Sequence, residues 1–179
     1  KLGKKYQFVV DWFKNPVNKA YKTATYSYEN QHKRELDCMI AGVPHIFAYG
    51  GVHGAIPNYH AKGIILCLDV ASLYPSIMIE YVYLSRKLKN PQKYKEIRDE
   101  RLRLKKLKDK RQQTMKIVLN STYGILKDKN NPLYDPLMSN NVCVTGQLLL
   151  LDLIEKVEPY CQLILSNTDG VYMLVKDME

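Results

Sequence analysis

Two aspartates stand at the ends of apolar runs, where a strand would meet solvent. Asp69 follows the unbroken apolar run at residues 64–68, which is typical of a buried strand. Asp169 lies in the turn at residues 167–170, between two further apolar runs. A pair of carboxylates can hold two Mg²⁺ ions roughly 3.5–4 Å apart, as two-metal phosphoryl transfer requires. The chemistry that these residues suggest is therefore metal-assisted reaction at phosphate.

Each aspartate also has a simpler structural interpretation. Asp69 or Ser72 could cap the helix expected over residues 75–83. Asp169 precedes a glycine, and Asp-Gly is common in hairpin turns for purely conformational reasons. Taken alone, neither aspartate distinguishes catalysis from local structure.

A third element is the helix expected over residues 112–124. Lys116, Asn120 and Tyr123 are spaced i, i+4 and i+7, so they share one face of this helix. A cation, an amide and an aromatic ring on one face could hold a triphosphate and flank a base pair. The alternative is an ordinary amphipathic helix with a solvated Lys116 and a half-buried Tyr123.

The composition of the chain limits its domain number, its partners and its location. The 179 residues are 46% hydrophobic, which suits one globular domain that can carry a protruding subdomain. The net charge of +9 favours a polyanionic partner, with nucleic acid first and an anionic membrane surface second. The four cysteines are scattered and typical of reduced thiols. With no signal peptide or membrane-length apolar run seen in the sequence, we expect a cytoplasmic protein without a membrane partner.

The remaining pattern predicts the elements that position these residues. Strands are expected at residues 6–13, 162–166 and 171–175, a loop or hairpin at 46–59, and a short helix or connector at 35–40. Helices are expected at residues 92–107, 111–123 and 141–157, with 108–110 as a short connector and Gly124 as the end of the second. The first two helices should form an antiparallel hairpin. His53 and His60 are interpreted as exposed or hydrogen-bonded side chains, not as ligands.

Three of these stretches resemble the sequence motifs of the family B DNA polymerases. Residues 69–77, DVASLYPSI, match motif A, D-x-x-S-L-Y-P-S-I. Residues 116–124 match motif B, K-x-x-x-N-S-x-Y-G, and residues 166–170, SNTDG, resemble motif C, whose usual form is Y-G-D-T-D-S. Tyr49-Gly50-Gly51 is similar to the family's Y-x-G-G loop but is one residue short. The resemblance covers residues 46–179 and is greatest to phage or prophage polymerases.

The resemblance implies a fold and a domain organisation. The fold would be α/β (α+β): a polymerase palm with an antiparallel sheet and helices on one face, plus a two-helix fingers hairpin. The palm would comprise residues 46–90 and 125–179, and the fingers residues 91–124. Residues 1–45 have no assigned role. Thumb and exonuclease domains would lie elsewhere in the same polypeptide, in a bacterial or phage-infected cell.

The resemblance also implies an activity, DNA-directed DNA synthesis from deoxynucleoside triphosphates on primer-template DNA with two Mg²⁺ ions. The metal ligands would be Asp69, Asp169 and the Val70 carbonyl, the two aspartates being catalytic. The nucleotide would be bound by Ser72, Leu73, Tyr74, Arg101, Lys116 and Asn120, with Tyr74 rejecting a 2′-hydroxyl. DNA would be contacted by Tyr123 and Gly124 at the nascent base pair and by Gly50 and Gly51 along the template.

Two positions depart from motif C. Asn167 replaces the first aspartate and Gly170 replaces the serine, which removes one negative charge. This loss could weaken metal affinity or shift preference towards Mn²⁺. It leaves an alternative open, namely a degenerate palm that binds nucleic acid without catalysis.

Overall fold

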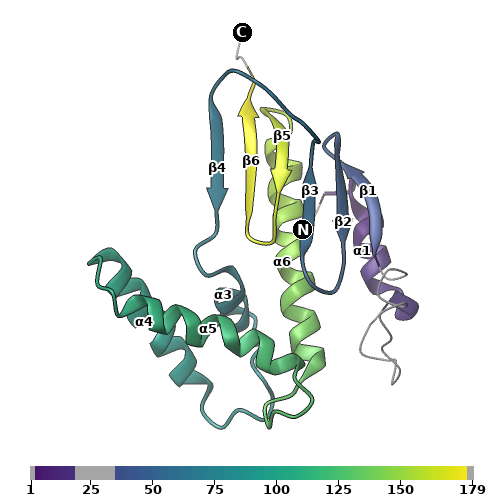
Figure 1. Cartoon of the computed structure of the whole chain (residues 1–179). Helices are drawn as coiled ribbons and strands as arrows, with labels where there is room; N and C mark the ends of the chain where they lie inside the picture. Colours follow the sequence, from purple (N-terminus) through teal and green to yellow (C-terminus); the bar gives the residue numbers. More distant parts are fainter. Residues whose placement is uncertain (1–2, 19–34, 177–179) are drawn as a thin grey trace. The chain divides into compact units, whose positions relative to one another are not determined.

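The computed structural model describes residues 3–18 and 35–176. The chain divides into two compact units (Figure 1). The sheet unit comprises Lys1–Ala71 and Cys143–Glu179, and the helical unit comprises Ser72–Val142. The chain therefore leaves the sheet unit just after the Asp69 segment and returns to it within a long helix.

The sheet unit is built on a six-stranded sheet in which every described pairing is antiparallel. The strands are β1 (Leu36–Ile40), β2 (Val43–Phe47), β3 (Val52–Ala55), β4 (Ile65–Asp69), β5 (Cys161–Ser166) and β6 (Gly170–Val175). Their order across the sheet is β1-β2-β3-β5-β6-β4. The α+β fold is confirmed, as are the hairpin at residues 46–59 and the strand pair that flanks Asp169.

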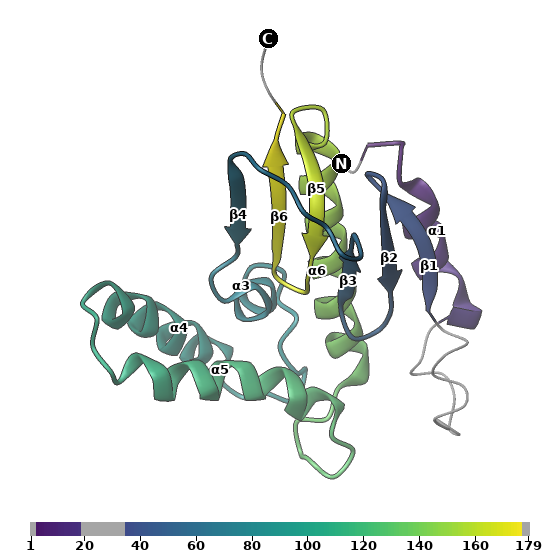
Figure 2. The ribbon, with the colours of Figure 1, turned by 45° about the horizontal axis from the view of Figure 1, so that its top comes forward.

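Helices cover one face of this sheet. They are α1 (Gln7–Lys14) and α6 (Pro136–Val157), the latter from Cys143 onwards, and a short 3₁₀ helix, η1 (Pro16–Asn18), follows α1. Figures 1 and 2 show α1 and α6 on the same side of the strands. In β2, buried and exposed residues alternate, so one face of the strand enters the core and the other is open. The core combines helix and strand residues, among them Val9, Phe13, Phe47, Leu150, Ile154, Leu163 and Met173.

The helical unit contains α3 (Leu73–Glu80), α4 (Pro91–Lys106), α5 (Gln112–Lys127) and the first turns of α6. Helices α4 and α5 pack as an antiparallel hairpin, as predicted (Figure 2). The Tyr94 hydroxyl of α4 donates to the Leu119 carbonyl of α5 at 2.9 Å. Both residues lie in a core that also includes Ile77 and Met78 of α3. Side chains from all three helices thus form one hydrophobic cluster.

Two predictions for the N-terminal part are wrong. The strand expected at residues 6–13 is instead helix α1 (Gln7–Lys14), because Tyr6, Val9 and Phe13, spaced by three and four, are buried together. Residues 35–40 contribute strand β1, whose partner β2 lies across a two-residue turn. In that turn Ala41 and Gly42 both have positive φ, 49° and 79°, as the tight hairpin requires.

The prediction that Asp69 ends a buried strand is also wrong in one respect. Strand β4 does end at Asp69, but all five of its residues are exposed, including Ile65 at 53% and Leu68 at 41%. The reason is the strand order, which places β4 at the edge of the sheet with β6 as its neighbour. An apolar run predicts a strand, but it does not predict whether that strand lies in the centre or at the edge of the sheet.

Helix ends differ from expectation at three places. Helix α5 continues through Gly124 to Lys127, and a Cβ at Gly124 would meet nothing within 4 Å. Neither Asp69 nor Ser72 caps α3 through its side chain. Helix α6 begins at Pro136 and is long and apolar enough to cross a membrane by length and composition alone, which corrects the sequence-based expectation. Core helices of soluble proteins satisfy the same criterion, and Leu150, Leu151 and Ile154 of α6 are buried against the sheet.

Candidate active site

Asp69 and Asp169 lie on neighbouring elements of the sheet unit. Asp69 is the last residue of β4, and its cross-strand partner is Gly170, the first residue of β6. Asp169 immediately precedes Gly170 in the β5–β6 turn, and its carbonyl accepts a 2.8 Å hydrogen bond from the Val70 N–H. Both aspartates are exposed. The main chain therefore joins the two segments that carry the predicted catalytic carboxylates.

Asn167 serves the geometry of the same turn. Its Oδ1 accepts a hydrogen bond from the Asp169 N–H at 3.3 Å, and its own N–H donates to the Gly170 carbonyl at 2.9 Å. An aspartate could accept the first of these bonds equally well. The Asn167 replacement therefore changes the charge of the turn and preserves its hydrogen bonding.

The glycine loop at residues 48–51 lies against this turn. A Cβ at Gly51 would stand 2.7 Å from the Thr168 Oγ1, so only a glycine fits there without movement. Gln147 of α6 fixes the start of the loop by a paired contact with Ala48. The Ala48 N–H donates to Gln147 Oε1 at 3.3 Å, and Gln147 Nε2 donates to the Ala48 carbonyl at 2.7 Å. At Gly50 a Cβ would meet nothing within 4 Å.

A buried histidine, His45, contacts the residue that precedes the β5–β6 turn. His45 is 2% exposed, and its Nδ1 must donate to the Val43 carbonyl, 2.8 Å away, because a carbonyl can only accept. Burial lowers the pKa of His45, although the bond to Val43 acts in the opposite direction. The ring is therefore neutral near pH 7, and its Nε2 accepts from the Ser166 hydroxyl at 2.8 Å. Ser166 is the residue directly before Asn167.

The helical unit holds a second group of predicted residues. Ser72 lies at the start of α3 with φ 60° and ψ 47°, a left-handed conformation that is uncommon for serine. Its Oγ accepts a hydrogen bond from Nη1 of Arg101, which is only 5% exposed. The Arg101 Nε is buried and has no hydrogen-bond partner among the described residues. A buried cation at a helix N-terminus is suited to an anion.

Aromatic and polar side chains of α3 and α5 complete this group. The rings of Tyr74 and Tyr123 meet edge to face with centroids 4.7 Å apart. Lys127 lies over the Tyr123 ring, with its Nζ 4.7 Å from the centroid. Lys116 and Asn120 are exposed on α5, four residues apart, and Leu73 is buried as the first residue of α3. The structure thus brings together Ser72 with Arg101 and Tyr74 with Tyr123.

The donor chemistry of the sheet unit fits Mg²⁺. This ion prefers oxygen ligands and is usually bound by one or two carboxylates together with substrate phosphates and water. Asp69 and Asp169 supply two exposed carboxylates. In residues 3–18 and 35–176 there is no group of three or more His, Cys, Asp or Glu side chains that could hold a metal. The carboxylates therefore suit an ion that completes its shell with phosphate and water.

Sequence reasoning missed Gln147, His45 and Ser166. The signal for Gln147 was a single amide directly before the run of four leucines at residues 148–151. A polar residue in an apolar helix must find a buried partner. Its partner, Ala48, lies 99 positions away, so no local pattern could identify it. His45 and Ser166 are 121 positions apart and show the same limit.

The antiparallel sheet with its strand-end carboxylates and the two-helix hairpin make this an α+β protein, as expected of a polymerase. Residues 82–172 match the sequence model of a family described as DNA polymerase family B. Because the match spans just over half of the 179 residues, the chain belongs to the family B DNA polymerases. The matched region includes Arg101, Lys116 and Asp169 and begins after Asp69. A search of curated proteins found no significant match.

Proposed function

We propose that this chain is the catalytic core of a DNA-directed DNA polymerase that adds deoxynucleotides to a primer 3′-hydroxyl. Membership of the family supports the general activity. The observation that carries the specific proposal is the 2.8 Å bond from the Val70 N–H to the Asp169 carbonyl, because it joins the segments of both carboxylates. Two-metal phosphoryl transfer needs carboxylates that lie near one another, and this backbone bond keeps the two segments adjacent.

In this proposal the sheet unit provides the ligands for the metal ions that act on the primer 3′-hydroxyl. Asp69, Asp169 and the Val70 carbonyl would hold Mg²⁺, and Mn²⁺ is the substitute to test. Bound metal would lower the pKa of the primer hydroxyl and stabilise charge on the leaving group. Gly50 and Gly51 would let the template backbone approach closely, since neither has a side chain. Asn167 would hold the turn without adding a third carboxylate.

The helical unit would bind the incoming deoxynucleoside triphosphate. The Ser72 and Leu73 amides at the start of α3 and the buried Arg101 suit a polyphosphate. Lys116 and Asn120 of α5 would add a cation and an amide at the phosphates. Tyr74, packed against Tyr123, would lie under the deoxyribose, and Tyr123 and Gly124 would border the base pair.

Primer extension tests the proposal. We would use the longest available form of the polypeptide, with Mg²⁺ or Mn²⁺, and compare Asp169→Asn with the control Asp37→Asn, an exposed aspartate of β1. Asp169→Asn should slow incorporation by roughly 10²-fold or more, because metal binding supplies several kcal/mol of transition-state stabilisation. Asp37→Asn should retain the wild-type rate. Equal rates in the two variants would refute the assignment of Asp169.

The alternative is a palm that binds nucleic acid without catalysis, and Asn167 is the observation that favours it. Folded wild-type protein that binds DNA but extends no primer in either metal would establish this alternative. Lys116→Ala separates the two functions further. A polymerase should lose nucleotide incorporation with little change in duplex affinity, whereas a binding module should lose only a small, salt-dependent part of its affinity.

A further inference from the structure

The positive charge of this protein is concentrated in the helical unit. Residues Ser72–Val142 contain sixteen lysines and arginines and seven acidic residues, a net charge of +9. The remaining residues carry eleven of each sign and are neutral overall. The whole net charge of the chain therefore lies in one unit. A field of one sign on one unit attracts a polyanion to that unit.

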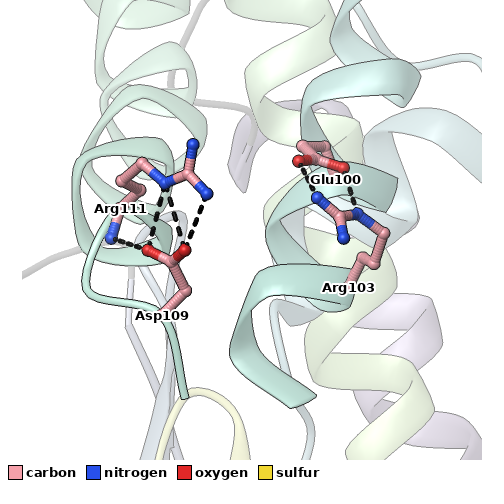
Figure 3. Close-up of polar contacts among 4 residues, drawn as sticks. All are labelled: Glu100, Arg103, Asp109 and Arg111. Carbon is pink, nitrogen blue, oxygen red and sulfur yellow. Dashed lines mark hydrogen bonds and ion pairs between the residues drawn. The ribbon is translucent and has the colours of Figure 1, made fainter. Parts of the chain in front are cut away.

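Within the helical unit, basic residues gather at the α4–α5 connection. Two arginines there are paired with the neighbouring acids (Figure 3). Arg103 donates to Glu100 through Nε and Nη2, both at 2.7 Å. Arg111 donates to Asp109 through its backbone N–H at 2.9 Å and through Nη2 at 2.8 Å. These bonds lower the pKa of Asp109 to about 2, so the carboxylate remains charged.

Four lysines of the same connection have no such partner. Lys105, Lys106, Lys108 and Lys110 are exposed, and no ion pair joins any of them to an acid within the described residues. We call these four residues the tip lysines. Both nearby acids are already neutralised by arginine, so the charge of the tip lysines faces solvent uncompensated.

Lys108 occupies a backbone position where glycine is the usual residue. The Lys108 N–H donates to the Lys105 carbonyl at 3.1 Å, and the Asp109 N–H donates to the Leu104 carbonyl at 3.0 Å. These two bonds define a Schellman motif that ends α4, with Lys108 at its left-handed residue. The φ of Lys108 is 55°, a conformation that is strained for a lysine and free for glycine. The conformation of this turn therefore does not by itself favour a lysine at position 108.

We propose that the tip lysines form a binding surface for the DNA phosphate backbone. Lysine acts on phosphate as a point charge, and such contacts position a nucleic acid without reading its sequence. The arginine pairs shape the turn, and the tip lysines provide the contacts. The inference rests on the proposed function only for the choice of DNA as the polyanion. An anionic membrane is the other polyanionic surface that the charge would fit, and the test includes it.

The experiment compares two charge-matched variants of the full polypeptide. In the tip variant Lys105, Lys106, Lys108 and Lys110 are changed to glutamine, and in the control Lys87, Lys89, Lys95 and Lys129 are changed. The control lysines are exposed residues of the same unit, and no ion pair joins them to an acid within the described residues. The dissociation constant for primer-template DNA is measured between 50 and 200 mM salt. The slope of log K against log salt should shrink by about 0.9 for each duplex phosphate that the tip variant no longer neutralises, and it should stay constant in the control.

Equal changes in both variants, or no change in either, would overturn the proposal. So would loss of binding to phosphatidylserine vesicles in the tip variant with unchanged DNA binding. Performing the titration with Asp169→Asn as the parent keeps the result independent of catalysis. A tip-specific change in slope would then support this surface even if primer extension failed in the wild type.

Lys108→Gly provides a second test that does not depend on the fourfold variant. Glycine relieves the strained φ, so the melting temperature should rise. The same change removes one cation, so the salt slope should shrink by about 0.9. A merely structural Lys108 would give the first effect without the second, and that result would remove this residue from the surface.

Discussion

Gly170 lies directly opposite Asp69 across the β4–β6 ladder, and the two strands leave no room for a side chain at position 170. A Cβ there would stand 2.9 Å from the Leu68 carbonyl oxygen and 3.5 Å from the Asp69 Cα. The Leu68 oxygen belongs to the backbone, so it cannot move aside as the end of a flexible side chain could. The glycine at this place, where the resembling motif has serine, therefore has a steric reason in the strand that carries Asp69.

Gly170→Ser should destabilise the protein, although it restores the residue of the usual motif. The added atoms force β4 and β6 apart, and overpacking of this kind costs roughly 1–3 kcal/mol. Urea unfolding would measure the loss. Gly50→Ser is the control in the same unit, because a Cβ at Gly50 meets nothing within 4 Å. Equal midpoints for the two variants would show that the strands adjust without cost.

The features that followed from sequence are local ones. The Asp-Gly turn predicted the β5–β6 hairpin, and the helical spacing of Tyr94, Ile97 and Leu104 predicted α4, because both signals lie within a few residues. The turn also located Asp169 at a strand end.

The features that did not follow depend on distant partners. Strand β4 has the composition of a buried strand, yet its exposure is decided by the order of strands from both halves of the chain. Arg101, expected from the resemblance to bind the nucleotide, is buried, and its Nη1 donates to Ser72, 29 positions earlier. Residues 19–34, part of the N-terminal segment without an assigned role, lie outside the described residues.

The pair Arg86–Asp135 should make the stability of the helical unit depend on pH. Burial alone would raise the pKa of the Asp135 carboxyl. The bonds from Arg86 Nε and Nη2, both 2.9 Å, outweigh burial and hold this pKa below its ordinary value of 3.8. Since the folded pKa is the lower one, the pair contributes fully above about pH 4 and loses its contribution as the pH falls through the folded pKa.

Asp135→Asn should therefore reduce the difference between the free energies of unfolding at pH 7 and at pH 3. At pH 7 it should cost roughly 1–3 kcal/mol, an amount that allows for the 65% exposure of the Arg86 side chain. Urea unfolding at pH 7 and at pH 3 measures both effects. Asp128→Asn, an exposed change in the same loop, is the control and should alter neither curve. A full acid dependence in Asp135→Asn would assign the effect to other carboxylates.

Gln147 should control the order of the glycine loop. Its side chain is 1% exposed and bonds both the N–H and the carbonyl of Ala48, the residue before Tyr49. Gln147→Leu keeps the approximate volume and removes both bonds to the half-buried Ala48, whose carbonyl retains only a weak 3.6 Å contact from the Cys143 thiol, at a total cost of roughly 1–3 kcal/mol. Gln147→Glu keeps the acceptor for the Ala48 N–H and loses the donor. Hydrogen exchange at the Ala48 amide should therefore be fastest in the leucine variant and closer to wild type in the glutamate variant. Gln162→Leu, on the exposed side of β5, should leave that amide protected. Unchanged protection in Gln147→Leu would mean that the strands alone hold the loop in place.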